Sequence, residues 1–232
     1  MKTFRQFFEQ NESKSLTATF GRFNPPTIGH EKLIKAVEGI AGGGDFKIYA
    51  SQTHKKQKDK KGFYKDPIGY DDKVKFMKEM FPEYQNNIVY DTDIRTIWDI
   101  LTRAYNDGYT KLTLVFGEDR LGQGDQSMEE LIKKWHGNEG AHGFYEFVDG
   151  LEFENAGERV EGAEGVEGMS ASKMRNLVIN SDEQAFFDSL PPNFTYKREL
   201  FDAVKEGLPL PSDEELATFI SSDRLTNVDP NS

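Results

Sequence analysis

Hydrophobic and polar positions follow two periods along most of the chain. The stretch SLTATF (residues 15–20) places Leu, Ala and Phe on one side and two Thr on the other, which is typical of a strand. HEKLIKAVEGI (30–40) then spaces its apolar residues along one helical face. The same succession returns twice: strands are expected over residues 45–51, 86–92 and 111–117, and helices over 71–81 and 96–108.

Strands that alternate with helices indicate an α/β fold. We expect a Rossmann-like, doubly wound, mostly parallel sheet with helices on both faces. Further along, EELIKKWH (129–136) predicts a helix, FYEFVD (144–149) predicts a strand, and helical character resumes over 169–191. The expected organisation is an N-terminal amphipathic segment and linker over 1–14, one main domain over 15–206, and a cap or tail over 207–232.

Composition narrows the range of functions. The 232 residues suffice for one compact α/β domain. Lys and Arg number 29 against 40 Asp and Glu, and this net charge of −11 argues against general nucleic-acid binding. The absence of cysteine excludes disulfides, thiolate nucleophiles and cysteine-bearing zinc sites, and suits a cytoplasmic location. We expect no membrane partner, because no apolar run is long enough to span a membrane. The sequence is compatible with a monomer or an oligomer.

Candidate chemistry lies in TFGRFNPPTIGHEKLI (19–34). A glycine turn that joins the first parallel strand to a helix places backbone N–H groups and the positive helix end in one spot, which suits a phosphate. Gly21 lets the chain turn close to a ligand, Gly29 allows close backbone approach, and His30 would point at the phosphate. The simpler interpretation is that Thr27 and His30 merely cap the helix. The segment does not fit G-x-G-x-x-G, and the chain lacks G-x-x-x-x-G-K-[ST].

Two motifs resemble a known family. GRFNPPTIGH (21–30) resembles the G-x-F-x-P-x-[H/T]-x-G-H signature of the nucleotidyltransferase superfamily, which includes nicotinamide-mononucleotide and pantetheine-phosphate adenylyltransferases and glycerol-phosphate cytidylyltransferases. MSASKMR (169–175) resembles its second motif, [I/M]-S-[ST/A]-[ST]-x-x-R. Between them, DPIGYDDKVKFMKEMF (66–81) resembles the element N-P-[FL]-x-x-x-x-[RK]-x-x-[ML], and LVFGEDR (114–120) stands where many members carry G-[SA]-D. The resemblance covers residues 16–190.

The resemblance implies a reaction and a set of site residues. An acceptor phosphate or hydroxyl would attack the α-phosphorus of a nucleoside triphosphate and release pyrophosphate. Mg²⁺ is expected to bind together with the triphosphate, and the resemblance assigns no protein residue as its ligand. His30 would bind the α-phosphate, Thr27 would help to hold the triphosphate, and Arg175 would bind the β and γ oxygens. Ser170 could equally serve only as a helix N-cap. The further nucleotide-binding positions implied are Gly21, Arg22, Phe23, Gly29, Asp119, Ser170 and Ser172.

This chain also departs from the family pattern. Thr27 stands where many members have the first histidine, as it does in one branch of nicotinamide-mononucleotide adenylyltransferases. Glu118 replaces a small residue beside Asp119. The F-N-P-x-T pattern favours ATP with nicotinamide mononucleotide, and CTP with a phosphorylated alcohol or sugar is the alternative. The basic run HKKQKDKKGFYK (54–65) is either a lid over phosphates or a solvated loop.

A non-catalytic function is a third hypothesis. MKTFRQFFEQ (1–10) resembles the short capsid-targeting peptides of some tailed-phage internal proteins. The chain would then be a nucleotide-binding protein made in the host cytoplasm and packaged in the virion. The simpler alternative is an amphipathic helix that docks on its own domain.

Overall fold

The structure, a computed structural model, describes residues 13–55, 65–117, 127–157 and 169–208. Five parallel strands form one sheet in the order β3-β2-β1-β4-β5. This topology confirms the expected Rossmann-like, doubly wound α/β fold. The strands are β1 (Ser15–Gly21), β2 (Asp45–Ala50), β3 (Ile88–Val89), β4 (Lys111–Phe116) and β5 (Gly150–Asn155).

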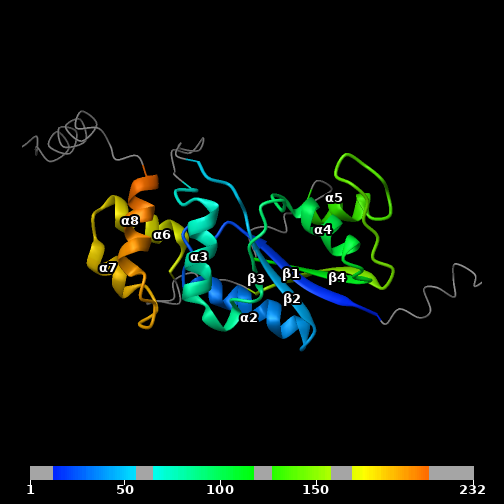
Figure 1. The fold of residues 1–232 in the computed structure, drawn as a ribbon, viewed down its shortest axis with the longest axis horizontal. Helices are drawn as coiled ribbons and strands as arrows, with labels where there is room; N and C mark the ends of the chain where they lie inside the picture. Colours follow the sequence, from blue (N-terminus) through cyan, green and yellow to red (C-terminus); the bar gives the residue numbers. More distant parts are fainter. Residues whose placement is uncertain (1–12, 56–64, 118–126, 158–168, 209–232) are drawn as a thin grey trace, which may run out of the picture.

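Helices cover both faces of the sheet (Figure 1). On one face, α2 (Gly29–Ala41) and α3 (Tyr70–Met80) bury their apolar sides against β2. On the other, α4 (Ile97–Asn106) and α5 (Met128–Trp135) pack on β1 and β4. The connections after β1 and β4 therefore leave toward opposite faces, and ligands of open α/β sheets bind at the carboxyl ends of such strands.

Three C-terminal helices gather beside α3 (Figure 1). They are α6 (Ala171–Ile179), α7 (Glu183–Asp188) and α8 (Lys197–Gly207), and they share one core with α2 and α3. The predicted helical stretch 169–191 is two helices, because Ser181 adopts a φ of 56° and the side chain of Asp182 caps α7. The sequence pattern did not predict α8, nor the short 3-10 helix η1 (Pro82–Tyr84).

The strand predicted over 144–149 is wrong. These residues precede β5, which pairs with β4 from Lys111↔Gly150 to Phe116↔Asn155. Tyr145 and Phe147 are buried because they anchor a loop: the Tyr145 hydroxyl donates to the Ile132 carbonyl at 2.7 Å. The alternating burial over residues 144–149 thus arises from packing of a loop and not from a β-strand.

Several predictions concern residues outside the described part of the chain. They are the N-terminal segment, most of the basic run, Asp119 and nearly all of the C-terminal tail. Within the described ranges, no helix combines the length and apolar character needed to cross a membrane.

Gly207 generates a testable prediction about packing. A Cβ atom at this position would lie 1.9 Å from the carbonyl oxygen of Pro67. We expect Gly207→Ala to lower the free energy of unfolding by about 1–3 kcal/mol, because the backbone around residue 67 must shift. Urea unfolding followed by circular dichroism measures the change.

Gly39 provides the matched control. It is exposed on α2, and among the described residues no atom outside its own helix lies within 4 Å of a Cβ built there. Gly39→Ala is expected to raise the free energy of unfolding by about 0.5–1 kcal/mol, because Ala favours the helix. Equal effects of the two substitutions would contradict the packing of α8 on Pro67.

Candidate functional site

The β1–α2 loop packs tightly on Gly21, the last residue of β1. Phe23 has a φ of 45° and its ring is buried above Gly21. A Cβ atom at position 21 would lie 2.5 Å from the ring. The missing side chain of Gly21 is therefore used for packing within the loop, whatever ligand the loop also approaches.

His30 is held in a defined tautomer when it is neutral. Its Nδ1 accepts a hydrogen bond from the Thr27 backbone N–H at 3.0 Å, and the Thr27 Oγ1 lies 3.0 Å from the same nitrogen. The Phe23 ring packs on the imidazole with 4.8 Å between centroids. Because a backbone amide can only donate, Nδ1 carries no proton, and the neutral ring is protonated on Nε2. Nε2 is thus the nitrogen that can donate to a phosphate oxygen.

The start of α2 does not support the capping interpretation of Thr27. Ile28 occupies the N-cap position and has no side-chain cap hydrogen bond. The His30 and Glu31 amides instead donate to the carbonyls of Thr27 and Ile28. Thr27 is 1% exposed and its hydroxyl faces His30. Its role on a triphosphate stays a prediction.

The second motif meets the first one in space. Arg175, on α6, donates from Nη1 to the Asn24 carbonyl at 2.6 Å, across 151 positions of sequence. Its Nη2 donates to Ser172 Oγ at 3.0 Å, so Ser172 orients the guanidinium. Ser170 is the N-cap of α6 and accepts from the Lys173 amide. The structure therefore uses Ser170 as the cap that the sequence left as an alternative.

Asn24 also binds the segment that precedes α3. Its side-chain amide donates to the Ile68 carbonyl and accepts from the Ile68 N–H, both at 3.0 Å. Lys55, near the start of the basic run, meets Asp66, which directly follows the run: the Lys55 amide donates to the Asp66 carbonyl at 3.0 Å. The third resembling element, residues 66–81, thereby joins the loop of the first motif.

Positive charge gathers around this junction. Arg22 is exposed, whereas Lys73 and Arg175 are 0% and 8% exposed. Burial lowers the pKa of Lys73 to about 8, with Asp66 opposing and Arg22 adding to the effect. Burial and then Arg22 lower the pKa of Arg175, which Asp66 opposes. Among the described residues, Arg22 and Asp66 thus act on both buried cations, and this excess of positive charge suits a polyphosphate.

Sequence reasoning missed Lys73 and Asp66. Both stand at fixed positions of the element N-P-[FL]-x-x-x-x-[RK]-x-x-[ML], with Asp66 in place of the Asn and Lys73 at the [RK] position. The motif was therefore the signal that could have found them. Within the described residues, buried side-chain oxygens without a hydrogen-bond partner belong to Thr19, Ser51 and Asp66. Thr19 lies in β1, Ser51 directly follows β2, and Asp66 lies in the segment before α3.

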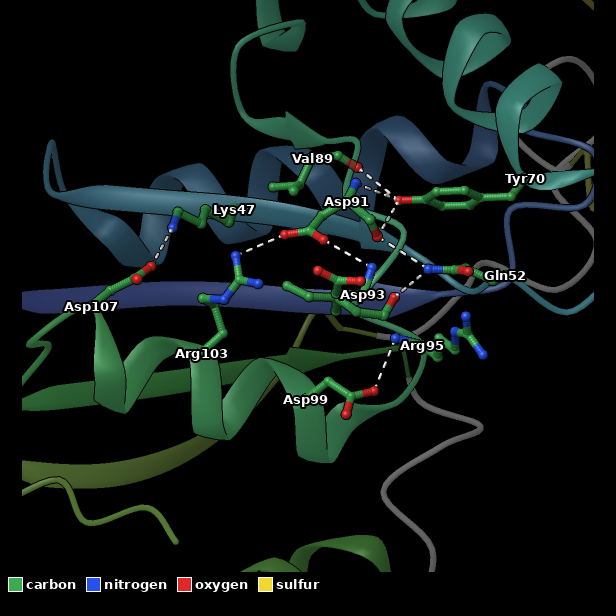
Figure 2. A network of polar contacts seen from close by, with 11 residues as sticks. Lys47, Gln52, Tyr70, Val89, Asp91, Asp93, Arg95, Asp99, Arg103 and Asp107 are labelled. Carbon is green, nitrogen blue, oxygen red and sulfur yellow. Dashed lines mark hydrogen bonds and ion pairs between the residues drawn. The ribbon is translucent and has the colours of Figure 1, made fainter. Parts of the chain in front are cut away.

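The loop after β3 is fixed by a separate polar network (Figure 2). The Tyr70 hydroxyl accepts from the Asp91 N–H at 2.9 Å, and Gln52 donates to the carbonyls of Asp91 and Ile94. Arg103 binds the Asp91 carboxylate at 2.8 Å. Because Tyr70 begins α3, this network fixes the helix one turn before Lys73.

Comparisons with known proteins add little to this geometry. No protein-family model matches the chain, and no curated protein matches it. Among solved structures, one that matches is nicotinic acid mononucleotide adenylyltransferase of Plasmodium falciparum complexed with NaAD. It has 13% identity and a TM-score of 0.49, over 82% of this chain and 98% of that one. A likeness of this degree assigns neither a substrate nor a residue role here.

Lys73 generates a prediction about stability and pH. Its pKa is about 8 in the fold against the ordinary 10.5, so the folded state disfavours the charged form. Above pH 8 the unfolded chain binds the proton more tightly, and the native protein gains stability as pH rises toward 10.5. Relative to Lys73→Met, the wild type should gain about 2 kcal/mol between pH 7 and pH 9.5.

Urea unfolding of both proteins at the two pH values measures this gain. Groups other than Lys73 titrate in both proteins and cancel in the comparison. A difference in stability that does not change between pH 7 and pH 9.5 would contradict the buried, charged lysine.

Proposed function

We propose that this chain is a nucleotidyltransferase that moves a nucleoside monophosphate from ATP onto a phosphorylated acceptor, with nicotinamide mononucleotide as the first choice. The observation that carries the proposal is the hydrogen bond between Arg175 and Asn24. This bond joins Arg175, from the second motif, to the β1–α2 loop of the first motif, at the carboxyl end of β1. Motif resemblance and tertiary contact are independent, because local sequence does not determine which distant segments meet.

The chemistry required of the protein is positioning and charge stabilisation. The acceptor oxygen forms a bond to the α-phosphorus while the bond to the bridging oxygen breaks, and pyrophosphate leaves with the electron pair. Negative charge therefore grows on the α-phosphate and on the leaving group. His30 would donate from Nε2 to an α-phosphate oxygen, and Arg175 would stabilise the leaving pyrophosphate through guanidinium N–H groups beyond the two already engaged.

Magnesium enters the proposal as part of the substrate. In the described part of the chain, no group of three His, Asp or Glu side chains is placed to hold a metal ion. Mg²⁺ commonly keeps several waters and binds through substrate phosphates. The triphosphate would thus bring the ion with it, and Arg22 and Arg175 would contact the remaining oxygens.

Pyrophosphate release tests the function. The protein would be incubated with ATP or CTP, Mg²⁺ and one acceptor from a panel that includes nicotinamide mononucleotide and phosphorylated alcohols and sugars. We expect release with ATP and nicotinamide mononucleotide, and a rate about 10²–10³-fold lower for His30→Ala, because one transition-state donor is lost. Lys35→Ala is the control, since Lys35 lies on the same helix with a 60% exposed side chain.

The outcomes separate the three hypotheses. Release only with CTP and a phosphorylated alcohol or sugar would establish the cytidylyltransferase alternative. Binding of a nucleotide without release from any pair would leave a non-catalytic nucleotide-binding protein. Release equal to that of His30→Ala in every mixture would refute the proposed activity.

The tautomer of His30 makes a sharper prediction. Because Nδ1 is engaged by Thr27, the reacting donor must be at the Nε2 position. A glutamine amide reaches that position and an asparagine amide reaches only the Nδ1 position. We expect His30→Gln to keep at least about tenfold more activity than His30→Asn, which corresponds to one hydrogen bond of ~1.4 kcal/mol. The reverse order would show that the donor has been assigned to the wrong nitrogen.

A further inference from the structure

Lys73 is a charged side chain that the proposed reaction does not use. It lies on α3 and is 0% exposed. Its Nζ donates to the Ser51 carbonyl at 2.6 Å and lies 3.4 Å from the Thr53 carbonyl. Lysine is almost never fully buried without partners, and here the ammonium has backbone carbonyls as hydrogen-bond partners.

The Ser51 backbone connects Lys73 to the start of the β1–α2 loop. Its carbonyl accepts from Lys73, and its N–H donates to the Gly21 carbonyl at 2.7 Å. Gly21 is the last residue of β1, so the loop that carries His30 begins there. Lys73 therefore supports the start of that loop through one intervening residue.

The position of Lys73 is fixed from its own helix. The Tyr70 hydroxyl accepts from the Asp91 amide and binds the loop after β3 (Figure 2). Tyr70 opens α3 with Lys73 three residues later. Tyr70 thus attaches α3 to the loop after β3, and Lys73 attaches it to the segment after β2.

The charged groups that act on Lys73 belong to the same site. They are Asp66, from the segment before α3, and Arg22, from the β1–α2 loop. Asp66 and Arg22 also act on Arg175. A bound polyanion would join this group, because it would favour the charged ammonium in the same way as Asp66 does.

We propose that Lys73 is a positioning residue for the phosphate site: its buried ammonium holds residues 51–53 against the start of the β1–α2 loop, and its charge couples polyphosphate binding to proton uptake. This inference rests on the proposed function in that the ligand is a nucleoside triphosphate. It adds a pH dependence that neither motif implies.

The direction of the pH dependence follows from the burial of the amine. Near pH 7 Lys73 is mostly protonated, because its pKa in the ligand-free protein is about 8. Above pH 8 it is mostly neutral, and a bound polyanion draws a proton back onto it. Binding should therefore weaken as pH rises through 8 and above, by about tenfold for each unit by which the ligand raises the pKa.

Calorimetry of MgATP and of inorganic tripolyphosphate tests the proposal. Titrations at pH 7 and pH 9 in two buffers of different ionisation enthalpy give the number of protons taken up on binding. We expect the wild type to take up a fraction of one proton at pH 9 that it does not take up at pH 7. Lys73→Met should lack this uptake and should bind at pH 7 as weakly as the wild type does at high pH.

Two further variants separate charge from structure. Lys73→Arg keeps a cation that does not titrate in this range, so its affinity should not fall between pH 7 and pH 9. Asp66→Asn removes the carboxylate that raises the pKa of Lys73, so the onset of proton uptake should move to lower pH. Thermal unfolding of each variant verifies that it is folded under the conditions used.

Three outcomes would overturn the role of Lys73. One is the same proton uptake in Lys73→Met as in the wild type, and another is no uptake in the wild type at pH 9. A uniform loss of affinity at both pH values, with uptake unchanged, would indicate a merely structural residue. If the wild type binds neither probe at any pH, the proposed function fails as well. The first three outcomes, in contrast, overturn only the role of Lys73.

Discussion

Asn24 is the residue on which the arrangement of the site depends. Its carbonyl accepts from Arg175 and its side-chain amide exchanges two hydrogen bonds with the Ile68 backbone. Asn24 is 1% exposed, so water cannot replace a missing partner. A buried polar group left without its hydrogen bond costs about 1–3 kcal/mol. The β1–α2 loop, the segment before α3 and helix α6 are therefore held together by one buried side chain and its carbonyl.

The same junction concentrates positive charge in an acidic protein. The whole chain carries a net charge of −11, yet Lys73 and Arg175 are buried close to Arg22 with Asp66 as the acidic neighbour. Burial makes each cation less stable, as the lowered pKa of Lys73 indicates. Packing of the surrounding helices must hold such groups in place. In the proposed function, a polyanion that binds there would relieve the repulsion among these cations.

Local pattern was enough to predict most elements, because amphipathic helices and strands have periods that depend only on neighbouring residues. It failed where burial had another origin. Tyr145 and Phe147 alternate as in a strand but anchor a loop, and no element was predicted over the edge strand β5, which pairs with β4. Helix α8 lies beyond the last motif, and its apolar residues were not recognised as core.

The sequence by itself determined the order of most strands and helices, the two motifs and the residues His30 and Arg175 as candidates. Only the tertiary structure decided that Arg175 contacts Asn24, that Thr27 faces His30 and leaves Nε2 as the donor, and that Lys73 is buried beneath the Ser51 carbonyl. The physical reason is that these hydrogen bonds depend on the path of the chain. Asn24 lies 44 residues from Ile68 and 151 from Arg175, distances over which no local periodicity carries information.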